Sequence, residues 1–287
     1  MNNKNLTTST DPTARTDSVI MSEHTTLINN SVESERRLVI SELRLTDIFD
    51  QYLRPCLTEF FGVAIFVFIG TSAACSPLAV EGVALAHGLT IALLVIGTGS
   101  ISGAHLNPAV TLGIWIGGGI APILAVLYVI SQLIGAILGA AFALGVVGYS
   151  AYDKCNGGGH VLPDHIAPGQ AFLCEVLLTA LLVTTVLVAA VDSSSKNSLA
   201  PLAIGFAVTV DILAGATFSG ASMNPARSFG PAVVVHNSSV WSYHWIYWVG
   251  PAIGAIVAGL IYRLLLASPE KRISPRPCSS ETEFTRM

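Results

Sequence analysis

Two nearly identical stretches constrain the fold of this chain more than any other part of its 287 residues. Residues 102–109 read SGAHLNPA and residues 219–226 read SGASMNPA, so that the asparagines Asn107 and Asn224 lie 117 residues apart. Asparagine is favoured as a helix N-cap and proline at the first helical position, so each stretch predicts the start of a helix. Two matched helix starts predict a duplicated unit.

The composition predicts an all-α membrane protein with several spans. Hydrophobic residues make up 52% of the chain and charged residues only 11%, whereas a soluble domain is roughly one-quarter charged. The apolar segments that directly follow the two motifs could cross only half of a bilayer core, which is ~30 Å thick. We therefore expect two re-entrant half-helices beside six full spans, at residues 57–74, 82–99, 121–147, 171–191, 199–217 and 241–266.

The two halves of the chain are expected to be inverted relative to each other, because each contains an odd number of spans. Glu59 and Glu175 lie 116 residues apart, and Gly135 and Gly254 lie 119 apart, which extends the repeat beyond the motifs. Inversion would bring the half-helices together with their N-termini facing, where their partial positive charges repel cations and hydronium. The asparagine NH₂ groups are expected to stay free to orient a polar solute. The predicted pore motifs are Asn107, Pro108, Ala109, Asn224, Pro225 and Ala226.

The order of apolar and polar segments predicts the organisation of the chain. Basic residues flank the first span and follow the last, which by the positive-inside rule predicts that both termini are cytoplasmic. We expect a disordered cytoplasmic segment, a first half-channel, an extracellular loop, a second half-channel and a cytoplasmic tail, at 1–49, 50–149, 150–170, 171–267 and 268–287. The plasma membrane is the default location, with a mitochondrial or other intracellular membrane left open.

Neither metal nor cofactor is expected, and the cysteines are interpreted as small core residues. The five cysteines show no C-x-x-C spacing, and Cys155, His160 and His165 are too scattered in a glycine-rich loop to indicate a metal site. The net charge of −4 lies mostly in the tails, so no nucleic-acid partner is expected.

Several polar residues within or beside the apolar spans need an explanation. Glu59 and Glu175 are expected to be buried acceptors for backbone N–H groups of the re-entrant segments. His105 is expected to line the pore, and Asp211 to have a structural hydrogen-bonding role rather than to bind ions. Asn237 begins a possible glycosylation sequon, whose use is left open.

The paired motifs, together with the run NPARSFG at 224–230, resemble those of the aquaporins, the major intrinsic protein family, over about residues 50–267. The runs at 205–215 (GFAVTVDILAG) and 244–248 (HWIYW) are similar to the aquaporin-8 branch. The resemblance implies six tilted helices with two half-helices, one pore in each subunit, and a homotetramer.

The resemblance also assigns a selectivity filter to His87, Ile212, Ala221 and Arg227. Water-selective relatives usually carry Phe, His and often Cys at the first three of these positions. The set found here implies a wider constriction that passes water, ammonia and hydrogen peroxide. Glycerol-conducting relatives usually have Asp where Ser228 follows the arginine, so glycerol is not expected.

Two classes of transport protein remain open at this point. A passive channel would exclude ions and protons, whereas a secondary transporter, which can also use inverted repeats and broken helices, would need an ion-coupling site. Apart from Asp211, the expected lumen offers no acidic residue for coupling. A closed-pore junction protein is a third alternative. An enzyme is not expected, because no nucleophile and base are paired outside the tails.

Overall fold

A computed structural model describes residues 27, 29–35 and 45–273, and within them all regular structure is helical. The chain divides into two units, Met1–Leu53 and Arg54–Met287, which are described separately. The first unit contains a helix at 29–35 and the π-helix η1 (Phe49–Leu53). The predictions for 1–26, 28, 36–44 and 274–287 lie outside the described residues.

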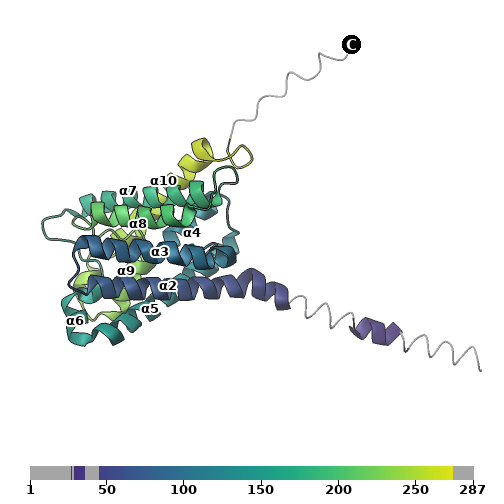
Figure 1. Cartoon of the computed structure of the whole chain (residues 1–287), viewed down its shortest axis with the longest axis horizontal. Coiled ribbons are helices and arrows are strands. Elements are labelled where there is room, and N and C mark those ends of the chain that lie inside the picture. The colour runs from purple at the N-terminus through teal and green to yellow at the C-terminus, as the bar shows by residue number, and fades with distance from the viewer. Residues whose placement is uncertain (1–26, 28, 36–44, 274–287) are drawn as a thin grey trace, which may run out of the picture. The chain divides into compact units, whose positions relative to one another are not determined.

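The second unit contains the elements of the predicted repeat (Figure 1). In chain order these are α2 (Arg54–Ala74), α3 (Val80–Ser102), α4 (Pro108–Ile116), α5 (Pro122–Val147), α6 (Tyr149–Lys154), η2 (Asn156–Gly158), α7 (Pro168–Val186), η3 (Leu187–Val191), α8 (Ala200–Gly215), α9 (Pro225–Val234), η4 (Ser238–Trp241), α10 (Ile246–Ile261) and η5 (Tyr262–Leu266).

Five helical segments of the described residues are long and apolar enough to cross a membrane: Leu45–Ala74, Val80–Ser102, Pro122–Val147, Pro168–Val191 and Ser238–Leu266. The sixth apolar helix, α8, has 16 residues, and at ~1.5 Å per residue it is slightly shorter than a typical bilayer core. The all-α membrane fold is confirmed, with a fifth span shorter than predicted.

The packing follows the inverted repeat. α2 packs mainly against α5, α7 against α10, and α3 against its counterpart α8. Half-helix α4 packs against α10, while half-helix α9 packs against α5. Each half-helix therefore lies against the last span of the opposite half, and the two halves interlock.

Small residues allow the closest of these contacts. A Cβ atom at Gly135 of α5 would overlap the carbonyl oxygen of Phe60 in α2, and one at Gly254 of α10 would overlap that of Val176 in α7. Because backbone atoms stand on the other side, these two helix pairs can approach closely only with glycine at these positions.

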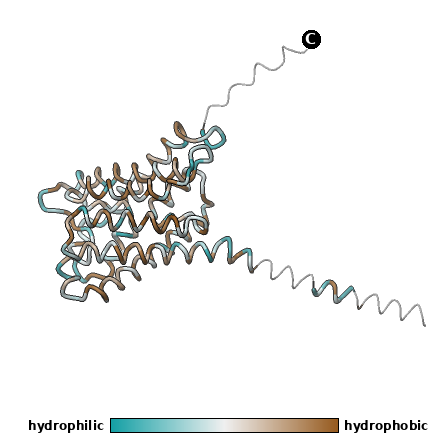
Figure 2. The backbone as a smooth tube through the Cα atoms, viewed as in Figure 1, coloured by the Kyte–Doolittle hydropathy of each residue, from teal (hydrophilic) through white to brown (hydrophobic). Residues whose placement is uncertain are grey.

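The outward faces are apolar and the polar side chains point inward. On α3, large apolar side chains recur every three or four residues on the exposed face, namely Leu85, Leu89, Leu93 and Ile96. Hydrophobic residues follow the spans, and hydrophilic residues gather at the connections (Figure 2). This distribution suits a protein surrounded by lipid.

Candidate functional site

The two half-helices begin where the motifs predict. The Asn107 side chain caps α4, its Oδ1 accepting from Ala109 N at 2.8 Å. The Asn224 side chain caps α9, its Oδ1 accepting from Ala226 N at 3.0 Å. In each case the proline occupies the first helical position, where no intrahelical N–H is needed.

The two asparagines also join the re-entrant segments to each other. Asn107 Nδ2 donates to the carbonyl oxygen of Met223 at 2.8 Å, and Asn224 Nδ2 donates to that of Leu106 at 2.9 Å. The expectation that both NH₂ hydrogens stay free was therefore wrong for one hydrogen of each amide. The other hydrogen remains available to a solute. The N-termini of α4 and α9 are held face to face by this reciprocal pair.

Glu59 anchors the first re-entrant segment, as predicted from its position in an apolar span. Its Oε1 accepts from Ser102 Oγ at 2.6 Å and from His105 N at 2.9 Å. Its Oε2 accepts from Leu106 N at 2.6 Å and from Gln132 Nε2 at 2.8 Å. All four contacts are buried, so this carboxylate satisfies backbone N–H groups that have no helical partner.

Glu175 repeats this arrangement in the second half. Its Oε1 accepts from Ser219 Oγ at 2.7 Å and from Ser222 N at 2.8 Å, and its Oε2 accepts from Met223 N at 2.7 Å. These donors follow their counterparts by 117 residues. The fourth donor is missing, because Pro251 stands where the first half has a glutamine.

The backbone of both re-entrant segments adopts left-handed conformations that side chains rarely allow. Ala104, Leu106, Ala221 and Met223 have φ values of 50°, 54°, 52° and 53°. Non-glycine residues in this region cluster at functional sites, where the surrounding contacts hold them in place. Here the glutamate and asparagine contacts provide that restraint on both segments.

Two tyrosines of the site were missed from sequence. Tyr128 donates its hydroxyl to the carbonyl oxygen of Ser102 at 2.8 Å, and Tyr247 donates to that of Ser219 at the same distance. They lie 119 residues apart, the separation already seen for the glycines of α5 and α10. An alignment of the two halves through those glycines would have found this pair.

Two cavities meet at the crossing of the re-entrant segments. The narrow cavity, of about 360 Å³, is lined by all four predicted filter residues, His87, Ile212, Ala221 and Arg227. The wide cavity, of about 920 Å³, is lined by His105 and by both capping asparagines. Four residues line both cavities: Phe66, Val208, Ser222 and Met223.

Arg227 is the buried cation of the narrow cavity, with 5% of its surface exposed. Its Nε donates to His87 Nε2 at 2.9 Å and its Nη1 donates to the carbonyl oxygen of Gly158 at 2.8 Å. Because a guanidinium only donates, His87 Nε2 must be unprotonated. His87 Nδ1 then donates to the carbonyl oxygen of Val83, at 2.8 Å. His87 is thus a neutral imidazole that positions Arg227.

Gly158 comes from the 150–170 loop, which was predicted to be only an extracellular connection. This loop contains α6 and η2, and Asn156, Gly157 and Gly158 have successive φ values of 52°, 63° and 62°. The Gly-Gly-Gly run at 157–159 was the available signal for such a left-handed turn. The turn directs a carbonyl group toward Arg227, and Gly158 itself lines the narrow cavity.

His160 of the same loop also lines the narrow cavity. Its Nδ1 lies 3.0 Å from Ser228 Oγ, one residue beyond Arg227. Burial, reinforced by the charge of Arg227, holds the pKa of His160 well below its usual value. This histidine is therefore neutral at physiological pH and adds a polar, uncharged group to the cavity wall.

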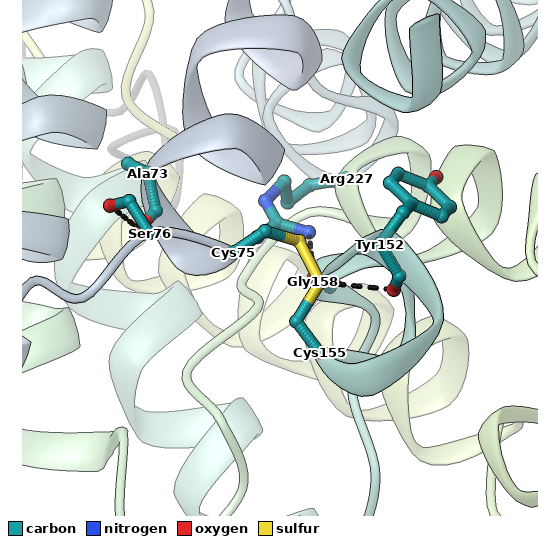
Figure 3. The surroundings of a disulfide bond; sticks show 7 residues. All are labelled: Ala73, Cys75, Ser76, Tyr152, Cys155, Gly158 and Arg227. Atoms are coloured by element: carbon teal, nitrogen blue, oxygen red, sulfur yellow. Dashed lines mark hydrogen bonds between the residues drawn. A yellow bond between two sulfur atoms is a disulfide. The ribbon is translucent and has the colours of Figure 1, made fainter. Parts of the chain in front are cut away.

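The interpretation of all cysteines as separate core residues was wrong, because Cys75 and Cys155 form a disulfide (Figure 3). The two are 80 residues apart, and only the return of the loop to the end of α2 brings them together. Cys56 and Cys174 are free, and Cys278 lies outside the described residues. As a disulfide sulfur, Cys155 is not a thiolate ligand, and the described residues contain no group of three side chains suited to a metal.

Asp211 does not have the predicted hydrogen-bonding role. It is 1% exposed, and neither carboxyl oxygen has a partner in the described part of the chain. One turn further along α8, Gly215 approaches Leu178 and Cys174 of α7, so this face of α8 packs on an apolar neighbour. Asp211 lines neither cavity.

Two inverted three-span halves, with half-helix N-termini meeting between two cavities, define a membrane channel fold. The family profile described as "Major intrinsic protein" matches residues 48–262. The chain belongs to the major intrinsic protein family. It is a membrane channel for small neutral solutes rather than an enzyme.

Relatives from distant organisms cover most of the chain. Aquaporin-8 of Mus musculus is 41% identical over 229 residues, which is 78% of this chain and 87% of the relative. A probable aquaporin of TIP type from Medicago truncatula is 40% identical over 228 residues, which is 74% of this chain and 87% of the relative. Aquaporin-5 of Ovis aries is 40% identical over 231 residues, which is 78% of this chain and 85% of the relative.

The solved structures agree on the fold. The X-ray structure of the aquaglyceroporin from Plasmodium falciparum has a TM-score of 0.67 to this chain, covering 74% of this chain and 96% of that one. At 23% sequence identity, this likeness supports the fold alone. It does not extend to the solute.

Proposed function

We propose that this chain is a passive channel for water, ammonia and hydrogen peroxide that excludes ions and protons. The observation that carries the proposal is the lining of the narrow cavity by His87, Ile212, Ala221 and Arg227. The names of the relatives, aquaporin-8 above all, support water as a permeant. Ammonia and hydrogen peroxide follow from the chemistry of the lining.

Exclusion of cations rests on three fixed sources of positive potential. The N-termini of α4 and α9 face each other at the crossing, each with roughly half an elementary charge. The Arg227 guanidinium adds a full charge in the narrow cavity. These charges lie in a low-dielectric surrounding, where repulsion of a cation is strong.

The asparagines oppose proton transfer. Asn107 and Asn224 each keep one N–H hydrogen that the structure does not pair. A water molecule whose oxygen accepts from both amides cannot also accept from its neighbours in a single file. The hydrogen-bonded chain that a proton would follow is interrupted there.

Discrimination among neutral solutes is assigned to the narrow cavity. Ile212 and Ala221 supply an apolar wall, and the small side chain of Ala221 leaves space in the cavity. Of the five N–H donors of Arg227, the structure pairs two, so the others can donate to a permeant. One polar wall and one apolar wall suit ammonia, water and hydrogen peroxide, which are small and neutral.

Stopped-flow measurements on proteoliposomes test this function. We expect osmotic water flux and ammonia uptake, each well above the flux of protein-free vesicles, with no proton conductance. Water flux without ammonia flux would restrict the channel to water. Absence of both, at normal reconstitution, would leave the closed-pore junction alternative.

The alternative of an ion-coupled transporter is disfavoured by the acidic residues. Glu59 and Glu175 are occupied as acceptors for backbone and side-chain donors, and Asp211 lines neither cavity. A channel predicts flux that is linear in the solute gradient and unaffected by Na⁺ or pH gradients. Uphill accumulation of a solute driven by either gradient would instead favour the transporter.

The assembly and location are part of the same proposal. Large apolar side chains on the outer faces support burial in a lipid bilayer and contact between subunits of a homotetramer. The disulfide supports an oxidising compartment on the side of Cys75 and Cys155. This side is extracellular for a plasma-membrane channel with both termini in the cytoplasm.

A further inference from the structure

We propose that the Cys75–Cys155 disulfide is a positioning device of the selectivity filter, so that its reduction lowers flux through the pore. The inference rests on the proposed role of Arg227 in the filter. It concerns residues outside the filter itself, which act on Arg227 through the carbonyl group of Gly158. In Figure 3 the disulfide lies beside the guanidinium of Arg227 and the contact with Gly158.

The disulfide connects a fixed point to a short turn. Cys75 directly follows α2, and its backbone N–H donates to the carbonyl oxygen of Thr71 at 3.0 Å. Cys155 directly precedes η2 and lies three residues before Gly158. A covalent bond at Cys155 therefore restrains the position of the Gly158 carbonyl relative to the end of α2.

The turn needs such a restraint because its backbone conformation is unusual. Three successive residues, 156–158, have positive φ, and only two of them are glycine. A second tether comes from the residue that precedes η4, where Asn237 Nδ2 donates to Asn156 Oδ1 at 2.7 Å. With the disulfide broken, this part-buried amide contact, the hydrogen bond from Arg227 and packing against Thr71, Tyr152 and Val235 would hold the turn, without a covalent link to α2.

Displacement of the turn would act directly on the filter. Arg227 would keep its bond to His87 but lose the acceptor of its Nη1 group. A buried cationic donor without an acceptor is costly, so the guanidinium would find its partner among the molecules in the narrow cavity. It would then extend into the pore and retain permeants longer, which lowers the flux of water and ammonia.

The chemistry of the switch is a simple exchange. A dithiol supplies two electrons and two protons to the S–S bond, leaving Cys75 and Cys155 as thiols, and is itself oxidised to a cyclic disulfide. The reductant in the experiment is dithiothreitol, added to protein that is already folded and reconstituted. A failure to fold without the disulfide therefore cannot be mistaken for the effect.

The experiment compares water flux per channel before and after dithiothreitol in three proteins. These are the wild type, the Cys56→Ser/Cys174→Ser variant, which keeps the disulfide without free thiols in the described residues, and the Cys75→Ser/Cys155→Ser variant. Loss of one charge-assisted hydrogen bond corresponds to a fall of at least about tenfold. We expect dithiothreitol to cause this fall in water flux, and to raise the activation energy of water flux, in the wild type and in Cys56→Ser/Cys174→Ser only.

The disulfide variant should start at the low flux and not respond to dithiothreitol. Unchanged wild-type flux, with reduction verified by thiol labelling of Cys75 and Cys155, would overturn the proposal. Loss of the response in Cys56→Ser/Cys174→Ser would also overturn it, because the free thiols would then be the sensor. If the untreated wild type conducts no water at all, the proposed function fails instead, so the two failures are distinguishable.

Discussion

At the scale of single residues, the site consists of two sets of matched contacts whose members lie 116 to 119 residues apart. Glu59 and Glu175 each hold a re-entrant segment by accepting from consecutive or near-consecutive backbone N–H groups. Asn107 and Asn224 then join the two segments. The filter breaks this symmetry, because Arg227 has no cationic counterpart at the matching position, which is occupied by Val110.

The Glu175→Gln variant tests the anchoring role. A glutamine has one accepting atom, so one of the three donors that Glu175 now satisfies would lose its partner. We expect a loss of about 1–3 kcal/mol in the free energy of unfolding, because an unsatisfied buried N–H keeps its full desolvation cost. Thermal unfolding in detergent measures it. The control Glu81→Gln, on an exposed residue of α3, should change little.

The residues that could be predicted are those that carry the repeat. Both motif asparagines and both glutamates are visible because the same pattern occurs twice in one chain. Gly158, His160 and the Cys75–Cys155 pair were missed because their roles depend on where the 150–170 loop returns in space. No local spacing encodes such a contact. The predicted hydrogen-bonding role of Asp211 was wrong because the sequence shows that the residue lies in an apolar span but not which side chains pack against it.

At the scale of secondary-structure elements, the paired helices α2 with α5 and α7 with α10 form the frame of each half. Hydropathy predicted their existence, and the motifs predicted the starts of α4 and α9. Hydropathy could not predict helix lengths that tertiary packing sets, and α8 ends at Gly215 rather than at 217. It also did not predict the short helices α6 and η2, which lie in the segment expected to be a loop.

The Gly135→Ala variant tests the close contact between α5 and α2. The added Cβ would overlap the backbone oxygen of Phe60, which cannot move aside as a side chain could. We expect a loss of about 1–3 kcal/mol in stability from overpacking. Gly145→Ala in the same helix is the matched control, since nothing lies near its Cβ position. That change should be neutral or stabilise by up to about 1 kcal/mol through helix propensity. Equal effects of the two changes would contradict the packing argument.

A carboxylate after η3 ties the C-terminal end of the described chain to the helical unit. Asp192 accepts from both Ser194 Oγ and Ser194 N, and from Tyr262 OH and Ser268 N at 2.8 Å each. The hydrogen bonds from the Ser194 hydroxyl and the Ser268 backbone hold the pKa of Asp192 well below its usual value. The ionised form is thus favoured in the folded protein.

The sign of the pH dependence follows from this lowered pKa. The carboxylate of Asp192 contributes stability above the pKa of the unfolded chain, about 3.9, and this is lost as pH falls toward the folded value. We expect Asp192→Asn to lower the unfolding temperature at pH 7 by about 2–4 °C, with a difference that shrinks below about pH 4. Asp164→Asn, on an exposed loop residue, is the control. A difference that grows on acidification would have the wrong sign.

At the scale of the whole molecule, the chain is a membrane channel built from two interlocked, inverted halves. The half-helix of each half packs against the last span of the other half. Residues of both halves line each cavity, so neither half alone forms a complete cavity. The motifs at the crossing belong to the channel frame as a whole. The four residues of the narrow cavity set its selectivity in our proposal, and they are the place where related channels would differ.

The proposed selectivity is tested most directly by the ratio of ammonia flux to water flux in the Ile212→His variant. A histidine would narrow the cavity and add a polar group to the wall that also contains Arg227, while Ile212→Val keeps an apolar side chain there and serves as control. Both fluxes are measured by stopped flow on the same proteoliposomes. We predict that Ile212→His lowers the ratio at least about tenfold, a change of ~1.4 kcal/mol in relative barrier, while water flux persists and the valine variant keeps the wild-type ratio. An unchanged ratio in Ile212→His would contradict the assignment of solute selectivity to this cavity.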